Sequence, residues 1–291
     1  MQAKNMTAQL IDGRRIASDI KENLRREVSG LTARGINPCL AVVFDGTDST
    51  SRRYVALKKK ACAEVGIDIL IYGIQKTTNQ SDLIKFVKKL NVNLKVNGIL
   101  LQFPLRDGLY KNIVSVIAPE KDIDGGSYHI FRKPLRNKPH FIPCNSLGVI
   151  KMLENYKIEV NGKYAVVVEG SKTDSNLGAL SFLLLQKGAA VITCSDDTAS
   201  LKKECLKADI LCVAVGKPKI ITVNMIKKGA TVIDMGMNMT SSGKVVGDVD
   251  FDTVRKKAAY VTPVPGGIGP MTIAMLMHNT VLAAKMQSNI L

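Results

Sequence analysis

The sequence of 291 residues contains no tryptophan, and aromatic residues of all kinds make up only 5% of it. It lacks any run of about 18 consecutive apolar residues, so no segment is long enough to span a membrane as a helix. The first ten residues show no apolar core of the kind that secretory signals have. With 46% hydrophobic and 23% charged residues, the composition is that of an ordinary globular protein. We therefore expect a folded, cytoplasmic protein with no membrane partner.

Metal-binding and disulfide patterns are also missing. The six cysteines lie far apart with no CxxC pair, and the three histidines are not at zinc-ligand spacing. We expect reduced, mostly buried thiols and no metal site. The residues are Cys39, Cys62, Cys144, Cys194, Cys205 and Cys212, with His129, His140 and His278.

Acidic residues are scarce relative to basic ones, since 25 Asp and Glu against 41 Lys and Arg give a net charge of +16. A basic surface favours nucleic acids and other anions, because binding a phosphate releases counterions. The basic residues are scattered, however, and few aromatic side chains are present to stack on bases. We expect no nucleic-acid partner. A solvated basic surface and attraction of an anionic small molecule both stay open.

Short apolar segments alternate with longer helical patterns. Continuous apolar runs of this length are typical of parallel strands buried on both faces, and their alternation with helices indicates βαβ units. The sequence therefore predicts an α/β fold. The segments are 40–44, 69–72, 98–101, 165–168, 190–193, 210–215 and 231–235.

The length suggests two domains. The interval 125–143 contains three prolines and several basic residues without a clear period, which indicates a connector. We predict a first domain over residues 1–148, completed by a C-terminal helix over 271–291. The second predicted domain, of the Rossmann type, covers residues 149–270, so the architecture is two α/β domains with a cleft between them.

A helix is predicted over residues 49–66, with Ser or Thr at 49–51 as its cap and Gly66 at its end. Tyr54 and Lys58 lie four residues apart in it, hence on one face. An aromatic ring beside an amine provides a stacking surface and a general acid or base, provided that burial lowers the lysine pKa. A surface pair on an amphipathic helix is the alternative.

Two further polar residues stand at the ends of elements in the first half. Gln102 ends a predicted buried strand, and Asp124 precedes a turn at Gly125. An amide and a carboxylate are suitable hydrogen-bonding partners for a polar heterocycle. Ordinary loop residues are the alternative.

In the second half, Gly170 and Ser171 follow a predicted strand and precede a helical pattern. This arrangement makes an anion site, because free N–H groups and the helix dipole point at a phosphate. No G-x-G-x-x-G is present, so an ordinary tight turn is the alternative. Asp196, 26 residues after Gly170, stands near the place of the ribose-binding acid of NAD folds, although a solvated loop is equally open. Gly216 and Met237 follow the next two strands and would line the same crevice.

Seven short segments of the sequence are informative when they are taken together, in their order along the chain. The most specific is Thr-Pro-Val-Pro-Gly-Gly-Ile-Gly-Pro-Met-Thr at 262–272. The others are Ile-Asp-Gly at 11–13, Tyr-Val-Ala-Leu-Lys at 54–58, Asn-Gly-Ile-Leu-Leu-Gln-Phe-Pro at 97–104, Pro-Glu-Lys-Asp-Ile-Asp-Gly at 119–125, Ile-Pro-Cys at 142–144 and Gly-Lys-Val-Val-Gly-Asp-Val at 243–249. Together they make the chain resemble, nearly end to end, the bifunctional methylenetetrahydrofolate dehydrogenase/methenyltetrahydrofolate cyclohydrolase family.

The resemblance implies oxidation of 5,10-methylenetetrahydrofolate by hydride transfer to a nicotinamide, then hydrolysis of the methenyl product to 10-formyltetrahydrofolate. It implies a homodimer in one-carbon metabolism, with Lys58 as the catalytic lysine and Gln102 as its hydrogen-bonding partner. Tyr54 would stack on the folate, and Asp124 would bind the amino edge of the pterin. The substrate-binding set that it implies is completed by Leu101, Phe103, Pro265, Gly266, Gly267, Ile268 and Gly269.

The dinucleotide region departs from the family pattern. The turn, usually G-R/A-S-x-x-V-G-x-P, begins Glu169-Gly170-Ser171 and lacks the Val-Gly-x-Pro part, and Glu169 brings a negative charge to where a pyrophosphate would lie. The usual C-H-S-R/K-T is replaced by Cys-Ser-Asp-Asp-Thr at 194–198, so aspartates stand where a 2′-phosphate would be met. We expect a cofactor, NADP or NAD, with NAD favoured. Its predicted contacts are Glu169, Gly170, Ser171, Asp196, Gly216 and Met237.

Three alternatives follow from these departures. In the first, the chain is a cyclohydrolase whose dehydrogenase site has decayed. In the second, it is a folate-binding protein without catalysis, although the intact set around Lys58 argues against this. The third is an unrelated two-domain NAD dehydrogenase of the shikimate type, which would leave the 262–272 segment without explanation. The excess positive charge is expected to attract polyglutamylated folate.

Overall fold

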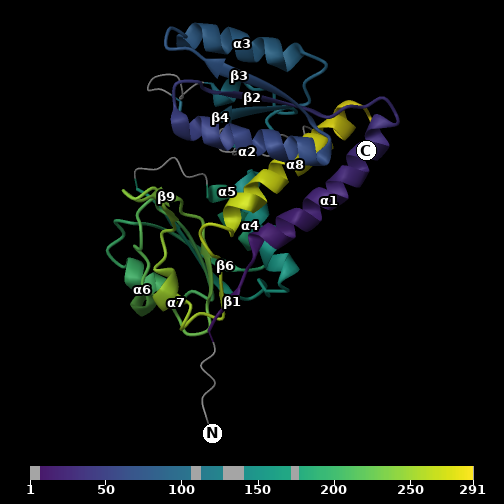
Figure 1. The fold of residues 1–291 in the computed structure, drawn as a ribbon. Coiled ribbons are helices and arrows are strands. Elements are labelled where there is room, and N and C mark those ends of the chain that lie inside the picture. Colours follow the sequence, from purple (N-terminus) through teal and green to yellow (C-terminus); the bar gives the residue numbers. More distant parts are fainter. Residues whose placement is uncertain (1–6, 106–112, 127–140, 172–176, 291) are drawn as a thin grey trace. The chain divides into compact units, whose positions relative to one another are not determined.

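The computed structural model describes residues 7–105, 113–126, 141–171 and 177–290. The chain divides into two compact units, whose elements are labelled in Figure 1. We call one the large-sheet unit, formed by the described residues up to Ala17 together with Asn145–Thr272. The other, the small-sheet unit, consists of Ser18–Cys144 and the residues from Ile273 onward, as far as they are described.

The N-terminal residues belong to a different unit from the one that the sequence predicts. The sequence predicts a first domain over residues 1–148, whereas β1 (Gln9–Leu10) pairs in parallel with β11 (Tyr260–Val261) of the large-sheet unit. The Ile11 N–H continues this pairing by donating to the Val261 carbonyl at 2.9 Å. A strand of two residues carries too little apolar pattern to be recognised in the sequence.

The large-sheet unit is built on a parallel sheet, in which the described strands follow the order β1, β11, β8, β7, β5, β6. Residues 165–168 in the middle of this sheet are fully buried, which explains their continuous apolar sequence. The remaining strands are β5 (Tyr164–Glu169), β6 (Ala190–Ser195), β7 (Ile210–Ala214), β8 (Thr231–Asp234) and a hairpin of β9 (Asn238–Met239) with β10 (Val245–Val246). The helices are α4 (Cys144–Asn155), α5 (Gly178–Gln186), α6 (Leu201–Cys205), η3 (Val223–Met225) and α7 (Phe251–Val254).

The small-sheet unit contains the parallel strands β3 (Asp68–Ile74), β2 (Cys39–Asp45) and β4 (Gly98–Gln102), in that order. Helices α2 (Ser49–Val65) and α3 (Gln80–Val92) lie on opposite faces of these strands (Figure 1). The apolar residues of α3 pack on Ala41, Val43, Ile99 and Leu101. A short helix, η1 (Val114–Val116), borders this core, and α1 (Gly13–Thr32) and α8 (Ile268–Gln287) each pass from one unit's residues into the other's.

The predicted α/β fold with parallel sheets is confirmed, and each predicted strand is present within about two residues of its expected bounds. Two helix starts differ from the prediction. The cap of α2 is Asp48, whose Oδ2 accepts from the Ser51 N–H at 2.5 Å, rather than a residue in 49–51. Helix α8 begins at Ile268, ahead of Pro270, because the first turn of a helix tolerates a residue without an N–H donor.

The six cysteines are free and buried, as expected. None of the helices among the described residues has the length and apolar character needed to cross a membrane. Most of the predicted connector, residues 127–140, lies outside the described residues, as do His129 and His140.

Candidate functional site

Lys58 lies in α2 and contacts the end of β4. Its Nζ donates a hydrogen bond to Gln102 Oε1, and the centre of the Tyr54 ring is 6.0 Å from Nζ. The Gln102 Nε2 donates to the Phe103 carbonyl at 2.7 Å, which turns the amide oxygen toward the ammonium group. The structure therefore brings together Tyr54, Lys58 and Gln102, which the sequence places as far as 48 residues apart.

The amino group of Lys58 is partly removed from water. Burial lowers the pKa of Lys58, and the carboxylate of Asp124 acts in the opposite direction. One turn further along α2, Cys62 is fully buried and its Sγ lies 3.4 Å from Met277 Sδ of α8. A lysine whose pKa is lowered exchanges protons closer to neutral pH than an exposed one.

Asp124 and Cys144 form a second group of titratable side chains within the small-sheet unit. Burial raises the pKa of Asp124 to about 6, while Lys58 and a hydrogen bond from Cys144 act to lower it. Burial, with Asp124 as a further cause, also raises the pKa of Cys144 well above its ordinary value. The Cys144 thiol donates to the Ile123 carbonyl at 3.4 Å, so it stays a neutral donor beside the carboxyl group.

Asn279 of α8 is a site residue that sequence reasoning missed. It is 2% exposed, and its Nδ2 donates to the Ile123 carbonyl at 2.8 Å and to the Ile142 carbonyl at 3.3 Å. These bonds tie the segment ahead of Asp124 and the segment ahead of Cys144 to one helix. A polar residue inside the apolar pattern of 271–286 is the signal that could have found it.

Two predicted substrate contacts lie at the carboxyl end of β4, Leu101 within the strand and Phe103 just after it. The Leu101 side chain is 5% exposed and belongs to the core beneath α3, because it shares a face of the strand with Ile99. A contact of Leu101 with substrate would therefore come from its backbone. Phe103 is partly buried and packs against the same core.

The turn at 265–269 belongs to the large-sheet unit, where it contacts the start of α1. The Arg14 N–H donates to the Gly266 carbonyl at 3.2 Å, and a Cβ added at Gly13 would lie 1.9 Å from the Gly267 carbonyl oxygen. Glycine at position 13 is thus required by close backbone approach, which joins the 11–13 and 262–272 segments. The contact of this turn with a substrate stays a prediction.

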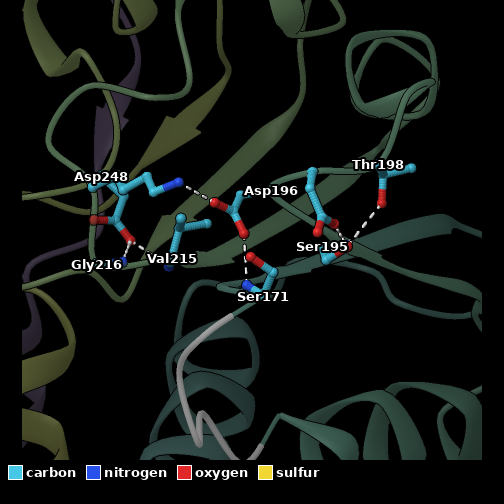
Figure 2. A network of polar contacts seen from close by, with 9 residues as sticks. Ser171, Ser195, Asp196, Thr198, Val215, Gly216 and Asp248 are labelled. Carbon is cyan, nitrogen blue, oxygen red and sulfur yellow. Dashed lines mark hydrogen bonds and ion pairs between the residues drawn. The ribbon is translucent and has the colours of Figure 1, made fainter.

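The carboxyl ends of β6, β5 and β7 lie side by side in the large sheet, and Figure 2 shows the polar contacts there. Asp196, which follows β6, accepts from the Ser171 N–H at 2.6 Å and forms an ion pair with Lys217, which follows β7. The Asp196 side chain is only 3% exposed. The Lys217 ammonium and the Ser171 N–H hold the pKa of Asp196 well below its usual range, so this carboxylate is ionised.

A second carboxylate shapes the neighbouring strand end. Asp248 Oδ2 accepts from the Val215 N–H at 2.6 Å and from the Gly216 N–H at 3.0 Å (Figure 2). A Cβ added at Gly236 would lie 2.2 Å from Asp248 Cγ, which explains this glycine. The N–H of Gly216, a predicted dinucleotide contact, therefore donates to a carboxylate of the protein itself. Sequence reasoning missed this carboxylate, Asp248.

Asp234 at the end of β8 is buried in the same way. Its carboxylate accepts from the backbone N–H groups of Gly236, Asp248 and Val249, each at 3.0 Å. Burial raises its pKa to about 6 in spite of these donors. A Cβ at Gly247 would lie 1.8 Å from Asp234 Oδ2, so the Val-Gly-Asp segment closes tightly over β8.

The other predicted dinucleotide residues lie around these strand ends. The Gly170 N–H donates to the Ala214 carbonyl at 3.2 Å, Glu169 ends β5, and Met237 is 52% exposed. Residues 172–176 of the turn lie outside the described residues. In the part of the chain that the structure describes, no group of three or more His, Cys, Asp or Glu side chains could hold a metal ion.

Two family models match the chain. The catalytic domain of tetrahydrofolate dehydrogenase/cyclohydrolase matches residues 11–124, and the NAD(P)-binding domain of the same enzyme matches residues 143–288. The chain belongs to the tetrahydrofolate dehydrogenase/cyclohydrolase family. The resemblance found in the sequence is thereby confirmed, and Lys58, Gln102 and Asp124 fall within the family's catalytic domain.

Relatives of this family cover nearly the whole chain. The bifunctional protein FolD of Thermodesulfovibrio yellowstonii is 50% identical over 98% of this chain and 99% of its own length. The FolD crystal structure from Campylobacter jejuni has a TM-score of 0.91 at 40% identity, covering 98% of this chain and all of that one. The Trypanosoma brucei FolD, a complex with NADP and an inhibitor, has a TM-score of 0.87 at 34% identity over 97% of this chain and 99% of that one.

Proposed function

We propose that the chain oxidises 5,10-methylenetetrahydrofolate with a nicotinamide dinucleotide and hydrolyses the 5,10-methenyl product to 10-formyltetrahydrofolate. The observation that carries this proposal is the hydrogen bond from Lys58 Nζ to Gln102 Oε1, beside Tyr54 and under the influence of Asp124. These residues lie in the segment that matches the family's catalytic domain.

In the hydrolysis, water adds to the cationic methenyl carbon, and the adduct loses a proton from the added oxygen. The bond from that carbon to N5 then breaks as N5 takes up a proton, while the hydroxyl group formed from the water loses its remaining proton and becomes the formyl oxygen. One proton is released overall. Lys58 is suited to carry these protons, because burial lowers its pKa and so weakens its hold on the proton. The Gln102 amide holds the amino group in one place through the cycle.

Binding of the folate is assigned to the same face of α2. Ser51, Tyr54 and Lys58 are spaced three and four residues apart and therefore share that face. The Ser51 Oγ is buried and has no hydrogen-bond partner among the described residues. Asp124 is ionised above about pH 6 and as a carboxylate accepts two N–H bonds from the amino edge of a pterin.

The dehydrogenase half uses the strand ends of the large-sheet unit, which matches the NAD(P)-binding domain. A bound dinucleotide supplies the hydride acceptor. Asp196 fits the ribose end of such a molecule, because a carboxylate accepts from ribose hydroxyls and repels a 2′-phosphate. We therefore infer that this chain prefers NAD to NADP. The Trypanosoma brucei relative, by contrast, forms a complex with NADP.

A cyclohydrolase without dehydrogenase activity is the second candidate. It is favoured by the N–H groups of Ser171 and Gly216, which already donate to Asp196 and Asp248 inside the protein. Glu169 adds a negative charge at the end of β5. If these groups do not rearrange, a pyrophosphate finds fewer donors at this edge.

The test measures both reactions in parallel by absorbance, with NAD and with NADP, in the wild type and in Lys58→Ala. We expect Lys58→Ala to lose roughly 10²- to 10⁴-fold in hydrolysis, the range that a positioned acid or base contributes. Lys59→Ala is the matched control, because Lys59 is the adjacent, exposed lysine of the same helix. Full hydrolysis by Lys58→Ala would exclude the assigned role, and hydrolysis without oxidation by either cofactor would establish the second candidate.

We also propose a homodimer that pairs through the β6 edge of the large sheet. Ile192 on β6 is 39% exposed, and Phe182 and Leu185 on the neighbouring α5 are 48% and 53% exposed. An apolar strip along a sheet edge is a favourable place for pairing with a second copy. The buried, free thiols support our expectation of a reducing, cytoplasmic setting.

A further inference from the structure

Asn279 of α8 lies between two chain segments that carry candidate site residues. Its Nδ2 donates at 2.8 Å to the carbonyl of Ile123, the residue before Asp124, and at 3.3 Å to the Ile142 carbonyl. The same nitrogen lies 3.6 Å from the Sγ of Cys144, whose side chain hydrogen-bonds with the Asp124 carboxyl group. Asn279 is 2% exposed, so its amide group is bonded to the protein rather than to water.

We propose that Asn279 is a positioning residue for the Asp124 carboxyl group, which it holds in the orientation that accepts the amino edge of a pterin. Asn279 acts through the backbone carbonyls and does not touch the ligand itself. The inference rests on the proposed binding of a folate beside Lys58. It goes beyond that proposal, because it makes recognition of the pterin ring depend on a residue of the C-terminal helix.

The backbone on both sides of Asp124 is anchored. On one side, the Ile123 carbonyl accepts from Asn279. On the other side, Gly125 has φ +69°, and a Cβ added to it would lie 2.6 Å from the backbone nitrogen of Pro143. Gly125 therefore packs directly against the second segment that the Asn279 amide group holds. With both neighbours fixed, the Asp124 side chain starts from a single backbone position.

Helix α8 also contacts the helix that carries Lys58. The Sδ of Met277 lies 3.4 Å from the Sγ of Cys62, which follows Lys58 by one turn of α2. Met277 and Asn279 are both buried, and two residues along a helix correspond to a rotation of about 200°. They therefore leave α8 on different sides. The helix acts as a spacer that fixes α2 and the Asp124 segment relative to each other.

Replacing Asn279 by leucine should separate binding from catalysis. Leucine has a similar volume and stays buried, but it offers no donor to the Ile123 and Ile142 carbonyls. The Asp124 carboxyl group then has several orientations available, so the pterin ring is held less well before the reaction and during it. Lys58 keeps its own partner, Gln102. A loss that is equal in the ground state and the transition state raises KM and leaves kcat unchanged.

The first experiment measures hydrolysis of 5,10-methenyltetrahydrofolate. We expect Asn279→Leu to raise KM at least about 10-fold while kcat stays within about 3-fold of the wild type. Asn279→Gln, which keeps an amide donor, should recover most of the loss in KM. If the leucine variant folds poorly, Asn279→Ala removes the same donor without adding bulk and should show the same separation of KM from kcat.

Two controls distinguish positioning from a general loss of stability. Gln287, about two turns further along α8, also donates to two backbone carbonyls, those of Asn97 and Glu120, each at 2.9 Å. Lys121→Met removes a buried donor and matches the loss of stability expected for Asn279→Leu. Gln287→Leu and Lys121→Met should each change KM by no more than about 3-fold. A merely structural role predicts the same KM for Asn279→Leu as for Lys121→Met.

The second experiment measures binding without turnover. Calorimetric titrations compare folic acid, whose pterin has the same amino edge, with p-aminobenzoylglutamate, which lacks the pterin. Asn279→Leu should weaken folic acid at least about 10-fold and p-aminobenzoylglutamate no more than about 3-fold. The double variant Asn279→Leu/Asp124→Asn should bind folic acid within about 3-fold of Asp124→Asn alone, because the first residue acts through the second.

The outcomes separate this inference from the proposed function. If the wild type does not hydrolyse the methenyl compound but Asn279→Leu weakens folic acid selectively, the proposed function fails and the positioning role stands. If the wild type is active, three results would each overturn the inference alone. These are a KM of Asn279→Leu equal to that of Lys121→Met, an equal loss for both ligands, and effects of the Asn279 and Asp124 substitutions that multiply in the double variant.

Discussion

Replacing Asp124 by Asn should stabilise the small-sheet unit while it weakens the folate chemistry. Burial raises the pKa of Asp124 from 3.8 to about 6. Between these pH values the folded chain keeps a proton that the unfolded chain has released. The contribution of this group to stability is therefore greatest below pH 4 and falls as the pH rises through 6. A pKa rise of this size corresponds to about 3 kcal/mol lost at pH 8.

Asparagine stays neutral at every pH, so it avoids this loss. We expect Asp124→Asn to be about 1 to 3 kcal/mol more stable than the wild type at pH 8, and we expect this gain to be about 2 kcal/mol smaller at pH 4.5. The lower limit allows for the attraction to Lys58 and the bond from Cys144, which asparagine weakens. Equilibrium urea unfolding from pH 4.5 to 8, followed by circular dichroism, measures the difference, and the hydrolysis assay should show a loss.

Asp68→Asn serves as the control, because Asp68 is an exposed carboxylate at the start of β3 in the same unit. Removing this exposed side chain's charge should change the free energy of unfolding by less than about 0.5 kcal/mol at pH 8. The reasoning is refuted if Asp124→Asn is no more stable than the wild type at pH 8, or if its gain is the same at pH 4.5. Either result would mean that the folded chain accommodates the Asp124 charge without cost.

Four further predictions address the supports of the site and the dimer. Lys121→Met should cost about 1 to 3 kcal/mol in urea unfolding, because the buried Lys121 Nζ donates to two carbonyls at the end of α3, at 3.2 and 2.8 Å. Asn279→Leu should destabilise by a similar amount, since two buried carbonyls lose their donor. Asp234→Asn should destabilise the protein at pH 8 by about 2 kcal/mol or more. The Asn side chain has one acceptor oxygen instead of two, so its NH2 group would face backbone N–H groups that need an acceptor. Phe182→Glu should weaken the dimer at least about 10-fold in sedimentation experiments, whereas Val92→Glu, 78% exposed in the other unit, should not; an unchanged dimer would place the interface elsewhere.

The sequence predicts the sheet strands well because their physical signal is local. A parallel strand buried on both faces must be apolar at each position, and residues 165–168 meet this requirement without reference to any other segment. The same logic fails for β1, whose two residues owe their conformation to pairing with β11. It also fails for the cap of α2, where three hydroxyl residues in the sequence compete with Asp48 and only the backbone geometry decides.

The part of the site that lies on one helix could be predicted from the sequence, whereas the part that depends on the order of the strands in the sheet could not. Tyr54 and Lys58 follow from helical spacing, whereas the bond to Gln102 follows from the pairing of β4 with β2. The pairing of Asp196 with Lys217 depends on β6 and β7 lying on either side of β5, which no spacing in the sequence encodes. For the same reason the sequence indicated carboxylates near a crevice and gave no hint that Lys217 neutralises one of them.

Asp124 and Asp234 show why a raised pKa does not by itself identify a functional group. Burial raises both to about 6, yet the oxygens of Asp234 are occupied by three backbone N–H groups that close the loop after β8. The neighbours that act on Asp124 are side chains, Lys58 and Cys144, which a substrate can join or displace. Loss of the charge should therefore have opposite signs at the two positions, stabilising at Asp124 and destabilising at Asp234. The partners of a buried carboxylate, rather than its pKa, distinguish a group that holds the fold from one that is kept for a ligand.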